Sequence, residues 1–502
     1  MKYSSIYFNM LTTFIVSMMM LIGCKDSADA DVSAPPPNPA PQPSATNNYK
    51  VSNMTEYQEK VAALNPGDTI TLAKGVWKDC KFVFYGKGTE GKPITLTVEE
   101  YGKTTIEGAS NLKMHGNYLV VDGLIFTNGY SATEQLIEFR KGSTQTANNS
   151  VLKNCMIDNY NRADETEKDA WINLWGRNNK VEHCYFGTKT NLGVIMIIWP
   201  NGEGHNKNYH QVTRNYFAGR PDLGVNGAET IRIGTSDYSK EISGTIIKGN
   251  YFEYCNGETE MISIKSCENK IAENTFFECQ GSVTLRHGNR NEISGNYFIG
   301  NKKANTGGVR VINAGHKIFN NYFYGCKGTT YRAPLNIMKG IPDSPDNGYH
   351  QVKDVEICFN TWIDCDLPWQ LAYGKDANKS LLPVNTRIAN NIVYSLNVST
   401  LLKAYDNIDG ITFDNNIAKG SKGFESRIGF VQNEITVENG SNGYPLALSD
   451  IKSSMGFTYV TTDVDGRPRG ASKAIGCLED NNSPATVVQA MKSNCGPSWY
   501  KK

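Results

Sequence analysis

The chain repeats a short motif, an Asn followed by two strand-favouring residues, at steps of about two dozen residues. The clearest copies stand at Asn250, Asn274, Asn296 and Asn321, which gives steps of 24, 22 and 25 residues. A short stretch of alternating apolar and polar residues precedes each copy. Weaker copies follow wider steps, as loop insertions would give, at Asn154, Asn215, Asn360, Asn391 and Asn416.

Short strands in a repeat of this length predict a parallel β-helix, in which successive coils stack about 4.8 Å apart. One coil cannot bury its apolar face alone, so the coils share a single core. The recurrent Asn can then hydrogen-bond its counterparts in the neighbouring coils as a ladder. A leucine-rich horseshoe would need a Leu spacing that is missing, and a propeller needs longer repeats of four antiparallel strands. We therefore predict an all-β fold, a single-stranded parallel β-helix over residues 50–420.

Both ends of such a stack need covering, because an open coil would pair with other chains. At the N-terminal end, residues 53–64 predict an amphipathic helix, with Asn53 and Glu56 spaced as a capping box. We expect this helix to cap the first coil. At the other end, residues 421–502 are irregular in composition and predict a C-terminal cap or tail packed on the β-helix, with a short helix after Ser483.

The N-terminal residues are predicted to be a targeting signal. An apolar stretch ends in Leu21-Ile22-Gly23-Cys24, which resembles a bacterial lipobox, so residues 1–23 are expected to be a lipoprotein signal peptide and Cys24 the lipidated residue. An ordinary secretory signal or an uncleaved anchor are the alternatives. Residues 24–49 are rich in Pro and predict a semi-rigid tether. We expect a lipid-anchored protein of the bacterial cell envelope, at the outer membrane on its surface or periplasmic face.

Charge and cysteine content exclude several classes of protein. Lys and Arg number 51 against 50 Asp and Glu, so no net field directs the chain to nucleic acid, and we expect membrane contact only through the lipid. Twelve Cys without a CxxC pair argue against a zinc module. Cys477 and Cys495 are the one pair for which a disulfide is considered, and the sequence leaves it open, as it does the oligomeric state.

Aligning four coils by their inward apolar pairs gathers chemistry-bearing residues on one outward face. The aligned pairs are Ile231 and Ile233, Ile262 and Ile264, Val283 and Leu285, and Val309 and Val311. In this alignment Lys265 lies one coil below Arg286, and Glu229, Glu258 and Glu260 lie close by, with Asn226 just ahead. Clustered carboxylates repel one another unless something neutralises them. A network of surface ion pairs is one interpretation; a cation site beside a catalytic pair is the other.

The ligand chemistry favours the second interpretation. Asn226, Glu258 and Glu260 offer only oxygen atoms, which suit a hard cation such as Ca²⁺. Such an ion could bind a uronate carboxylate and acidify the C5 proton of the sugar. Lys265 ordinarily titrates near ~10.4, and Arg286 and a metal would favour its neutral form, which could remove that proton. Arg286 stays charged and could stabilise the enolate or assist the leaving oxygen.

The segments 226–236, 257–266 and 286–288 resemble polysaccharide lyase family 6, which contains alginate lyases and chondroitinase B. The resemblance extends from about residue 65 to residue 420 and implies a right-handed parallel β-helix. It implies Lys265 as Brønsted base, Arg286 as acid or charge stabiliser, and Asn226, Glu258 and Glu260 as Ca²⁺ ligands. The sequence keeps the family pattern at all five positions.

Further residues are expected to contact substrate, an anionic polysaccharide: His287, Arg310, Arg332, Glu229 and Arg232. The function predicted is a lyase that cleaves 4-linked uronic-acid polymers, alginate above all, by β-elimination. Dermatan sulfate is the alternative substrate, and a non-catalytic, carbohydrate-binding surface β-helix is the alternative class of protein. The preferred alginate block and endo or exo action are not determined by the sequence.

Overall fold

The computed structural model describes residues 46–374, 376–398, 400–420, 428–431, 433–440, 442–479 and 483–500. The predicted signal peptide, Cys24 and most of the tether lie outside the described residues. Residues from Thr46 onward form one compact unit. No helix among the residues described is both long and apolar enough to pass through a membrane.

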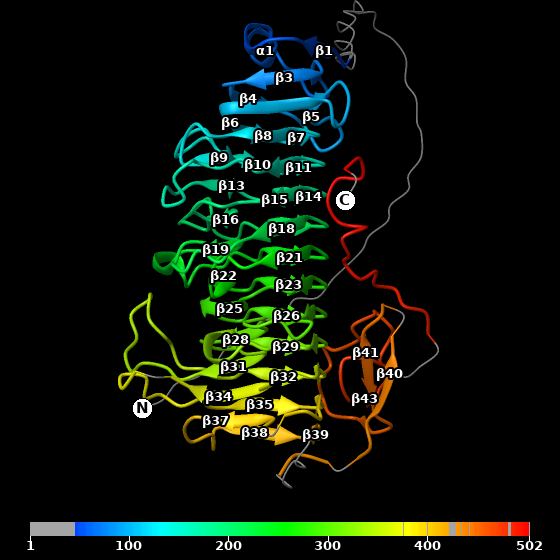
Figure 1. Ribbon diagram of the computed structural model, residues 1–502. Coiled ribbons are helices and arrows are strands. Elements are labelled where there is room, and N and C mark those ends of the chain that lie inside the picture. Colours follow the sequence, from blue (N-terminus) through cyan, green and yellow to red (C-terminus); the bar gives the residue numbers. More distant parts are fainter. Residues whose placement is uncertain are drawn as a thin grey trace, which may run out of the picture. The chain divides into compact units, whose positions relative to one another are not determined.

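The chain winds through three parallel sheets, A, B and C, and the coils stack along one axis (Figure 1). Sheet A contains β1 (Asn48–Val51), β2 (Thr69–Leu72), β5 (Ile94–Val98), β7 (Leu119–Asp122), β11 (Val151–Lys153), β14 (Lys180–Glu182), β17 (Gln211–Thr213), β20 (Ile246–Lys248), β23 (Lys270–Ala272), β26 (Glu292–Ser294), β29 (Lys317–Phe319), β32 (Glu356–Cys358), β35 (Thr386–Ala389) and β38 (Ile411–Asp414). Every pairing within this sheet is parallel and joins one coil to the next.

Sheets B and C share the long strand β6 (Thr104–Asn117), whose first half pairs in B and second half in C. Sheet B adds β3 (Gly75–Lys78), β8 (Ile125–Ser131), β12 (Met156–Asp158), β15 (Tyr185–Gly187), β18 (Tyr216–Arg220), β21 (Tyr251–Cys255), β24 (Thr275–Phe277), β27 (Tyr297–Ile299), β30 (Tyr322–Tyr324), β33 (Thr361–Ile363), β36 (Ile392–Ser395) and β39 (Ile417–Gly420). Sheet C adds β4 (Lys81–Lys87), β9 (Gln135–Glu138), β10 (Ala147–Asn148), β13 (Ala170–Leu174), β16 (Met196–Ile198), β19 (Ile231–Gly234), β22 (Glu260–Lys265), β25 (Ser282–His287), β28 (Val309–Val311), β31 (Leu335–Met338), β34 (Trp369–Tyr373) and β37 (Leu402–Ala404).

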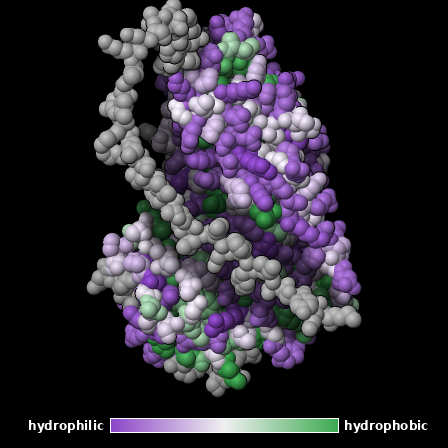
Figure 2. Space-filling model, turned by 180° about the vertical axis from the view of Figure 1, so that it is seen from behind, coloured by the Kyte–Doolittle hydropathy of each residue, from purple (hydrophilic) through white to green (hydrophobic). Residues whose placement is uncertain are grey.

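This architecture confirms the predicted parallel β-helix. The inward pairs are in the predicted register: Ile231 pairs with Ile262, Ile262 with Val283, and Val283 with Val309. Their side chains are fully buried in the shared core. The outer face seen from behind is dominated by hydrophilic residues where it is not covered in grey (Figure 2), as expected when side chains alternate between core and solvent.

The Asn ladder is confirmed. At each turn between sheets A and B, the side-chain oxygen of one Asn accepts from the backbone N–H of its counterpart in the preceding coil, as Asn296 accepts from Asn274 at 3.0 Å. The ladder runs through Asn215, Asn250, Asn274, Asn296, Asn321, Asn360, Asn391 and Asn416. Asn154 does not belong to it: the following residue, Cys155, stands level with Cys184, whose N–H bonds to Asn215.

The N-terminal cap is α1 (Met54–Val61), somewhat shorter than predicted. Asn53 caps it by accepting from the N–H of Glu56 at 3.0 Å, and the Glu56 carboxylate accepts from the N–H of Ser52 at 2.7 Å. Asn53 therefore caps the helix as predicted, whereas Glu56 accepts from the residue before the N-cap and not from the N–H of Asn53 itself, as a strict capping box would require. Tyr57 and Val61 are buried against the first coils.

The described part of the C-terminal region folds back along the β-helix. The antiparallel pairs β40 (Thr436–Asn439) with β41 (Pro445–Leu448) and β42 (Lys452–Ser453) with β43 (Lys473–Ala474) pack beside the late coils (Figure 1). The last residues return to the early coils, where the Trp499 indole donates to the carbonyl of Asn154. The prediction of a short helix after Ser483 is wrong: the segment has no regular secondary structure, and Ala490 and Cys495 pack it against apolar side chains of sheet B. Cys477 and Cys495 are not joined to each other by a disulfide and are buried in separate clusters.

Candidate active site

The predicted catalytic residues lie together in a groove of about 540 Å³ on the outer face of sheet C. Strand β22 carries Glu260 and Lys265, and β25 carries Arg286. The loop before β19 supplies Asn226 and Glu229, and the turn before β22 supplies Glu258. The residues that line the groove are Lys168, Asn226, Gly227, Glu229, Arg232, Glu258, Thr259, Glu260, Lys265, Arg286, Arg310, Tyr331 and Tyr349.

Two register shifts modify the predicted columns. Between β22 and β25, Ile264 pairs with Leu285 but Lys265 pairs with His287, so Arg286 occupies the extra position of a bulge. The prediction that Arg286 stands level with Lys265 is therefore wrong by one residue, although both side chains line the groove. A second shift, between Glu260 and Ile262, places Ser282 opposite Glu260.

The acidic residues of the groove differ in whether a basic side chain of the protein forms an ion pair with them. One oxygen of Glu260 contacts the guanidinium of Arg310 and lies 3.5 Å from Nε of Arg286, and the other accepts from Ser263 at 2.5 Å. Burial alone would raise the pKa of Glu260, but these two Arg side chains hold it below its ordinary value. Glu260 is thus neutralised by the protein itself.

Among the described residues, neither Glu258 nor Glu229 forms an ion pair with an Arg or Lys; the charge of Lys265 and the N–H of Gly227 only partly offset the effects that raise the pKa of Glu258. Burial, together with the charges of Glu229 and Glu260, raises the pKa of Glu258 to about 8. One carboxylate oxygen of Glu229 is buried without a hydrogen-bond partner. Oxygen donors of this kind, beside the amide of Asn226, have the chemistry of a hard-cation site. Within the described residues, no three His, Cys, Asp or Glu side chains converge closely enough to form a complete metal cage.

The remaining predicted contacts are distributed around the groove. Arg310 lies 5.1 Å from the ring of Tyr331, and Arg232 lies 5.7 Å from the ring of Trp199. Arg332 forms an ion pair of 3.6 Å with Asp222 and lines an adjoining pocket of about 570 Å³, which shares Asn226 and Glu258 with the groove. The structure does not bring His287 into the groove: its side chain is 1% exposed, and burial lowers its pKa to about 3.

Sequence reasoning missed two aromatic residues of the groove, Tyr331 and Tyr349, and the basic residue Lys168. Lys168 and Tyr349 come from loops and Tyr331 from the short 3-10 helix η2 (Thr330–Arg332), all outside the strands, where stacking of equal positions does not apply. The long step between Asn321 and Asn360 was the one available sign that a loop extends near this site.

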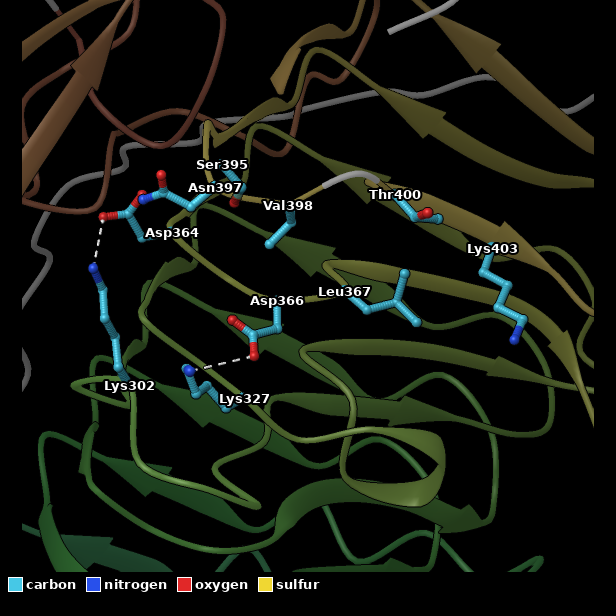
Figure 3. Close-up of a pocket in the computed structure, with 10 residues that line it drawn as sticks. All are labelled: Lys302, Lys327, Asp364, Asp366, Leu367, Ser395, Asn397, Val398, Thr400 and Lys403. Atoms are coloured by element: carbon cyan, nitrogen blue, oxygen red, sulfur yellow. Dashed lines mark ion pairs between the residues drawn. The ribbon is translucent and has the colours of Figure 1, made fainter. Parts of the chain in front are cut away.

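A larger pocket, of about 720 Å³, lies toward the C-terminal coils and is a weaker candidate (Figure 3). Two of its three lysines form ion pairs, Lys302 with Asp364 and Lys327 with Asp366, each at 3.5 Å, and the third, Lys403, lies over the ring of Tyr405. It offers neither a base beside uncompensated carboxylates nor an Arg aimed at them. Chemistry, and not volume, therefore selects the Lys265 groove.

Fold and groove together define a parallel β-helix protein with a charged site on sheet C, and comparisons identify its family. The family model of Chondroitinase B matches residues 51–460. The PL6 family alginate lyase AlyGC is 36% identical, with a TM-score of 0.81, over 91% of this chain and 59% of its own. A mannuronic acid specific family 6 lyase from human gut microbiota is 32% identical, with a TM-score of 0.71, over 75% of this chain and 87% of its own. The chain belongs to polysaccharide lyase family 6.

The chain spans 59% of the length of AlyGC. A PL6 alginate lyase solved in complex with a trisaccharide is 22% identical, with a TM-score of 0.64, and shares the fold over 80% of this chain and 91% of its own. No curated protein matches the chain.

Proposed function

We propose that the protein is a polysaccharide lyase that cleaves 4-linked uronic-acid polymers, alginate foremost, by β-elimination. The observation that carries the proposal is the shared groove of Lys265 and Arg286 beside Asn226, Glu229 and Glu258. Two similar proteins, at 36% and 32% identity, are described as an alginate lyase and a mannuronic acid specific lyase. Membership of the family supports the same chemistry here.

In this proposal the neutral amine of Lys265 takes the proton from C5 of the uronate. The C4–O bond then breaks, a double bond forms between C4 and C5, and the departing oxygen gains a proton. Arg286 is charged throughout and stabilises the negative charge that develops on the sugar carboxylate or the leaving oxygen. Arg232 and Arg310 add positive charge along the groove for an anionic chain.

A Ca²⁺ ion is part of the proposal. Of the three predicted ligands, Asn226 and Glu258 would hold it, whereas the third, Glu260, is already bound by Arg310 and lies next to them. Glu229, with one carboxylate oxygen buried without a hydrogen-bond partner, would take the third place. When bound, the ion would neutralise the uronate carboxylate and so acidify the C5 proton. Calorimetric titration with CaCl₂ tests the site directly: the wild type should bind, and Glu258→Gln should bind more weakly.

The test of activity is incubation of the purified domain with alginate and with dermatan sulfate, with absorbance of the new double bond as readout. Alginate should give the larger signal, and Lys265→Ala should reduce it by at least about 10²-fold, the lower range of general-base contributions. An unchanged rate would remove Lys265 from its role. Binding of alginate without an unsaturated product would favour a carbohydrate-binding β-helix instead.

We also propose that the protein is attached to the bacterial envelope through a lipid on Cys24, which follows the lipobox-like residues 21–23. Mass spectrometry of the mature N-terminus tests this. An acylated Cys24 supports the anchor, and an N-terminus elsewhere with no acyl chain contradicts it.

A further inference from the structure

We propose that Tyr349 is a positioning residue that holds the guanidinium of Arg286, and that the inserted loop between β31 and β32 belongs to the active site for this reason. The inference rests on the proposed function for its effect on catalysis, whereas the contact itself can be tested without any activity.

The loop contacts Arg286 in three ways. Nη1 donates to the carbonyl of Gly348 at 2.9 Å, and Nη2 donates to the carbonyl of Asn347 at 3.3 Å. The guanidinium carbon lies 4.4 Å from the centre of the Tyr349 ring. On its other side, Nε of Arg286 faces Glu260 at 3.5 Å. Three consecutive loop residues and one strand carboxylate therefore fix the orientation of this side chain.

A second cation contacts the same ring. Nζ of Lys379 lies 4.5 Å from the centre of Tyr349, and Lys379 is itself buried and paired with Asp376. A cation near an aromatic ring is attracted to its negative face. The ring of Tyr349 thus contacts two positive side chains, Arg286 and Lys379, at the edge of a groove proposed to bind an anionic chain.

The backbone at Tyr349 is anchored, so the ring has a defined place. The N–H of Ile341 donates to the carbonyl of Tyr349 at 2.7 Å, which closes the loop at its base. Gly340 exchanges two backbone hydrogen bonds with Leu381, at 2.8 and 2.9 Å. Farther out, Asp346 forms an ion pair of 2.8 Å with Lys240, which follows β19, four coils before β31. The loop consequently reaches from the late coils across to the coils that carry the catalytic residues.

This arrangement explains what the sequence insertion contributes. Arg286 sits in a bulge, where the regular strand ladder does not determine its direction. A long side chain left free would have to be ordered at each turnover. The loop provides that order beforehand, and pre-orientation of a charge-stabilising group acts on the chemical step more than on substrate binding.

Two variants of Tyr349 distinguish the contribution of its aromatic ring from those of its size and its hydroxyl, and a variant of Lys379 tests the second cation. Tyr349→Phe keeps the ring and should keep kcat within about twofold, whereas Tyr349→Leu keeps much of the bulk and should lower kcat about 2- to 30-fold with little change in KM, the range of a lost cation–π contact. Lys379→Met should give a smaller loss of the same kind. Thermal melting of Tyr349→Phe should match the wild type, and Tyr349→Leu, which keeps an apolar side chain against the small cluster of Ile312, Met338 and Tyr373, should melt within a few degrees of it.

An activity-independent readout is modification of arginine by a dicarbonyl reagent, followed by mass spectrometry of the Arg286 peptide. Tyr349→Leu should speed modification of Arg286 and leave the buried Arg220 unmodified; Tyr349→Phe should resemble the wild type. Equal modification and equal kcat in Tyr349→Leu and wild type would overturn the inference, and so would a Phe variant as impaired as Leu. A wild type that cleaves no uronan would refute the proposed function, while the modification rates would still decide this contact.

Discussion

Gly257, the residue before Glu258, offers the sharpest test of how the acidic cluster is built. A Cβ on Gly257 would lie 2.2 Å from the carbonyl oxygen of Ala228 and 2.8 Å from Cδ of the buried Arg220. Ordinary contacts of a Cβ begin near 3.4 Å, so the backbone segments of Gly257 and Ala228 would have to move apart by about 1.2 Å. Arg220 cannot yield easily, because its guanidinium donates to the carbonyls of Glu229, Asn191 and Gly193.

Gly257→Ala should therefore separate the segment that carries Glu229 from the one that carries Glu258. Overpacking of this kind costs about 1–3 kcal/mol of folding stability. A displacement of about 1 Å at a catalytic centre can cost about 10²-fold in rate. We expect a folded variant with a modestly lower midpoint in urea, at least about tenfold lower kcat on the uronan that the wild type cleaves, and weaker Ca²⁺ binding by calorimetry.

Gly142→Ala is the matched control, since a Cβ there would meet no atom within 4 Å and the residue is not in the left-handed region. It should be indistinguishable from the wild type in all three measurements. Wild-type stability and activity in Gly257→Ala would show that the two segments are free to move apart and that their close contact does not position the carboxylates.

The remaining predictions concern the ladders that hold the coils in register. Asn296→Ala should orphan the N–H of Asn274 and the carbonyl of Ile271, both of which bond to the amide. At about 1–3 kcal/mol for each buried unsatisfied group, unfolding in urea should show a loss of about 2–6 kcal/mol, against less than about 0.5 kcal/mol for the exposed Lys303→Ala; a loss as small as that of the control would contradict the reasoning. His316 is buried and accepts from the N–H of Asn291 through Nδ1, and burial lowers its pKa to about 4 from an ordinary 6.5. Between pH 6.5 and pH 4 only the unfolded chain takes up this proton, so its contribution is complete above pH 6.5 and about 3 kcal/mol is lost as the pH falls to 4. His316→Asn should flatten that part of the curve of unfolding free energy against pH, and an unchanged curve would exclude His316 as its source.

The fold could be predicted because every coil must satisfy the same buried turn and bury the same inward face, so the same residue types recur at the same positions. Asn250, Asn274, Asn296 and Asn321 each satisfy the same buried turn, so their spacing marks the coils directly. The inward pairs follow from the same logic, since a one-residue slip would turn apolar side chains to solvent. Position 154 was assigned one residue too early because Cys155, a small buried side chain, takes the place that Asn holds elsewhere.

Stacking also predicted which residues share the groove, but not how they meet. The bulge at Arg286 and the shift before Ile262 insert single residues that no alternation of apolar and polar positions reveals. His287 was expected at the substrate and is buried because the bulge turns Arg286 outward in its place. The contacts of Tyr349 join a loop to a strand 63 residues away, and no local pattern encodes such a distance.

The charges of the groove explain why its carboxylates are not equivalent, although the sequence presents them as one cluster. Arg310 and Arg286 bind Glu260 and lower its pKa, whereas burial and the neighbouring charge of Glu229 raise the pKa of Glu258, for which no ion pair exists among the described residues. The two carboxylates on either side of Thr259 therefore differ in their electrostatics: the pKa of Glu260 is lowered and that of Glu258 is raised. The ion pairs of the groove are made at Glu260, and none is made at Glu258 or Glu229 among the described residues. In the proposed mechanism, a cation bound at Asn226 and Glu258 would neutralise the carboxylate of the same uronate whose C5 proton Lys265 removes, so loss of either group should impair the same chemical step.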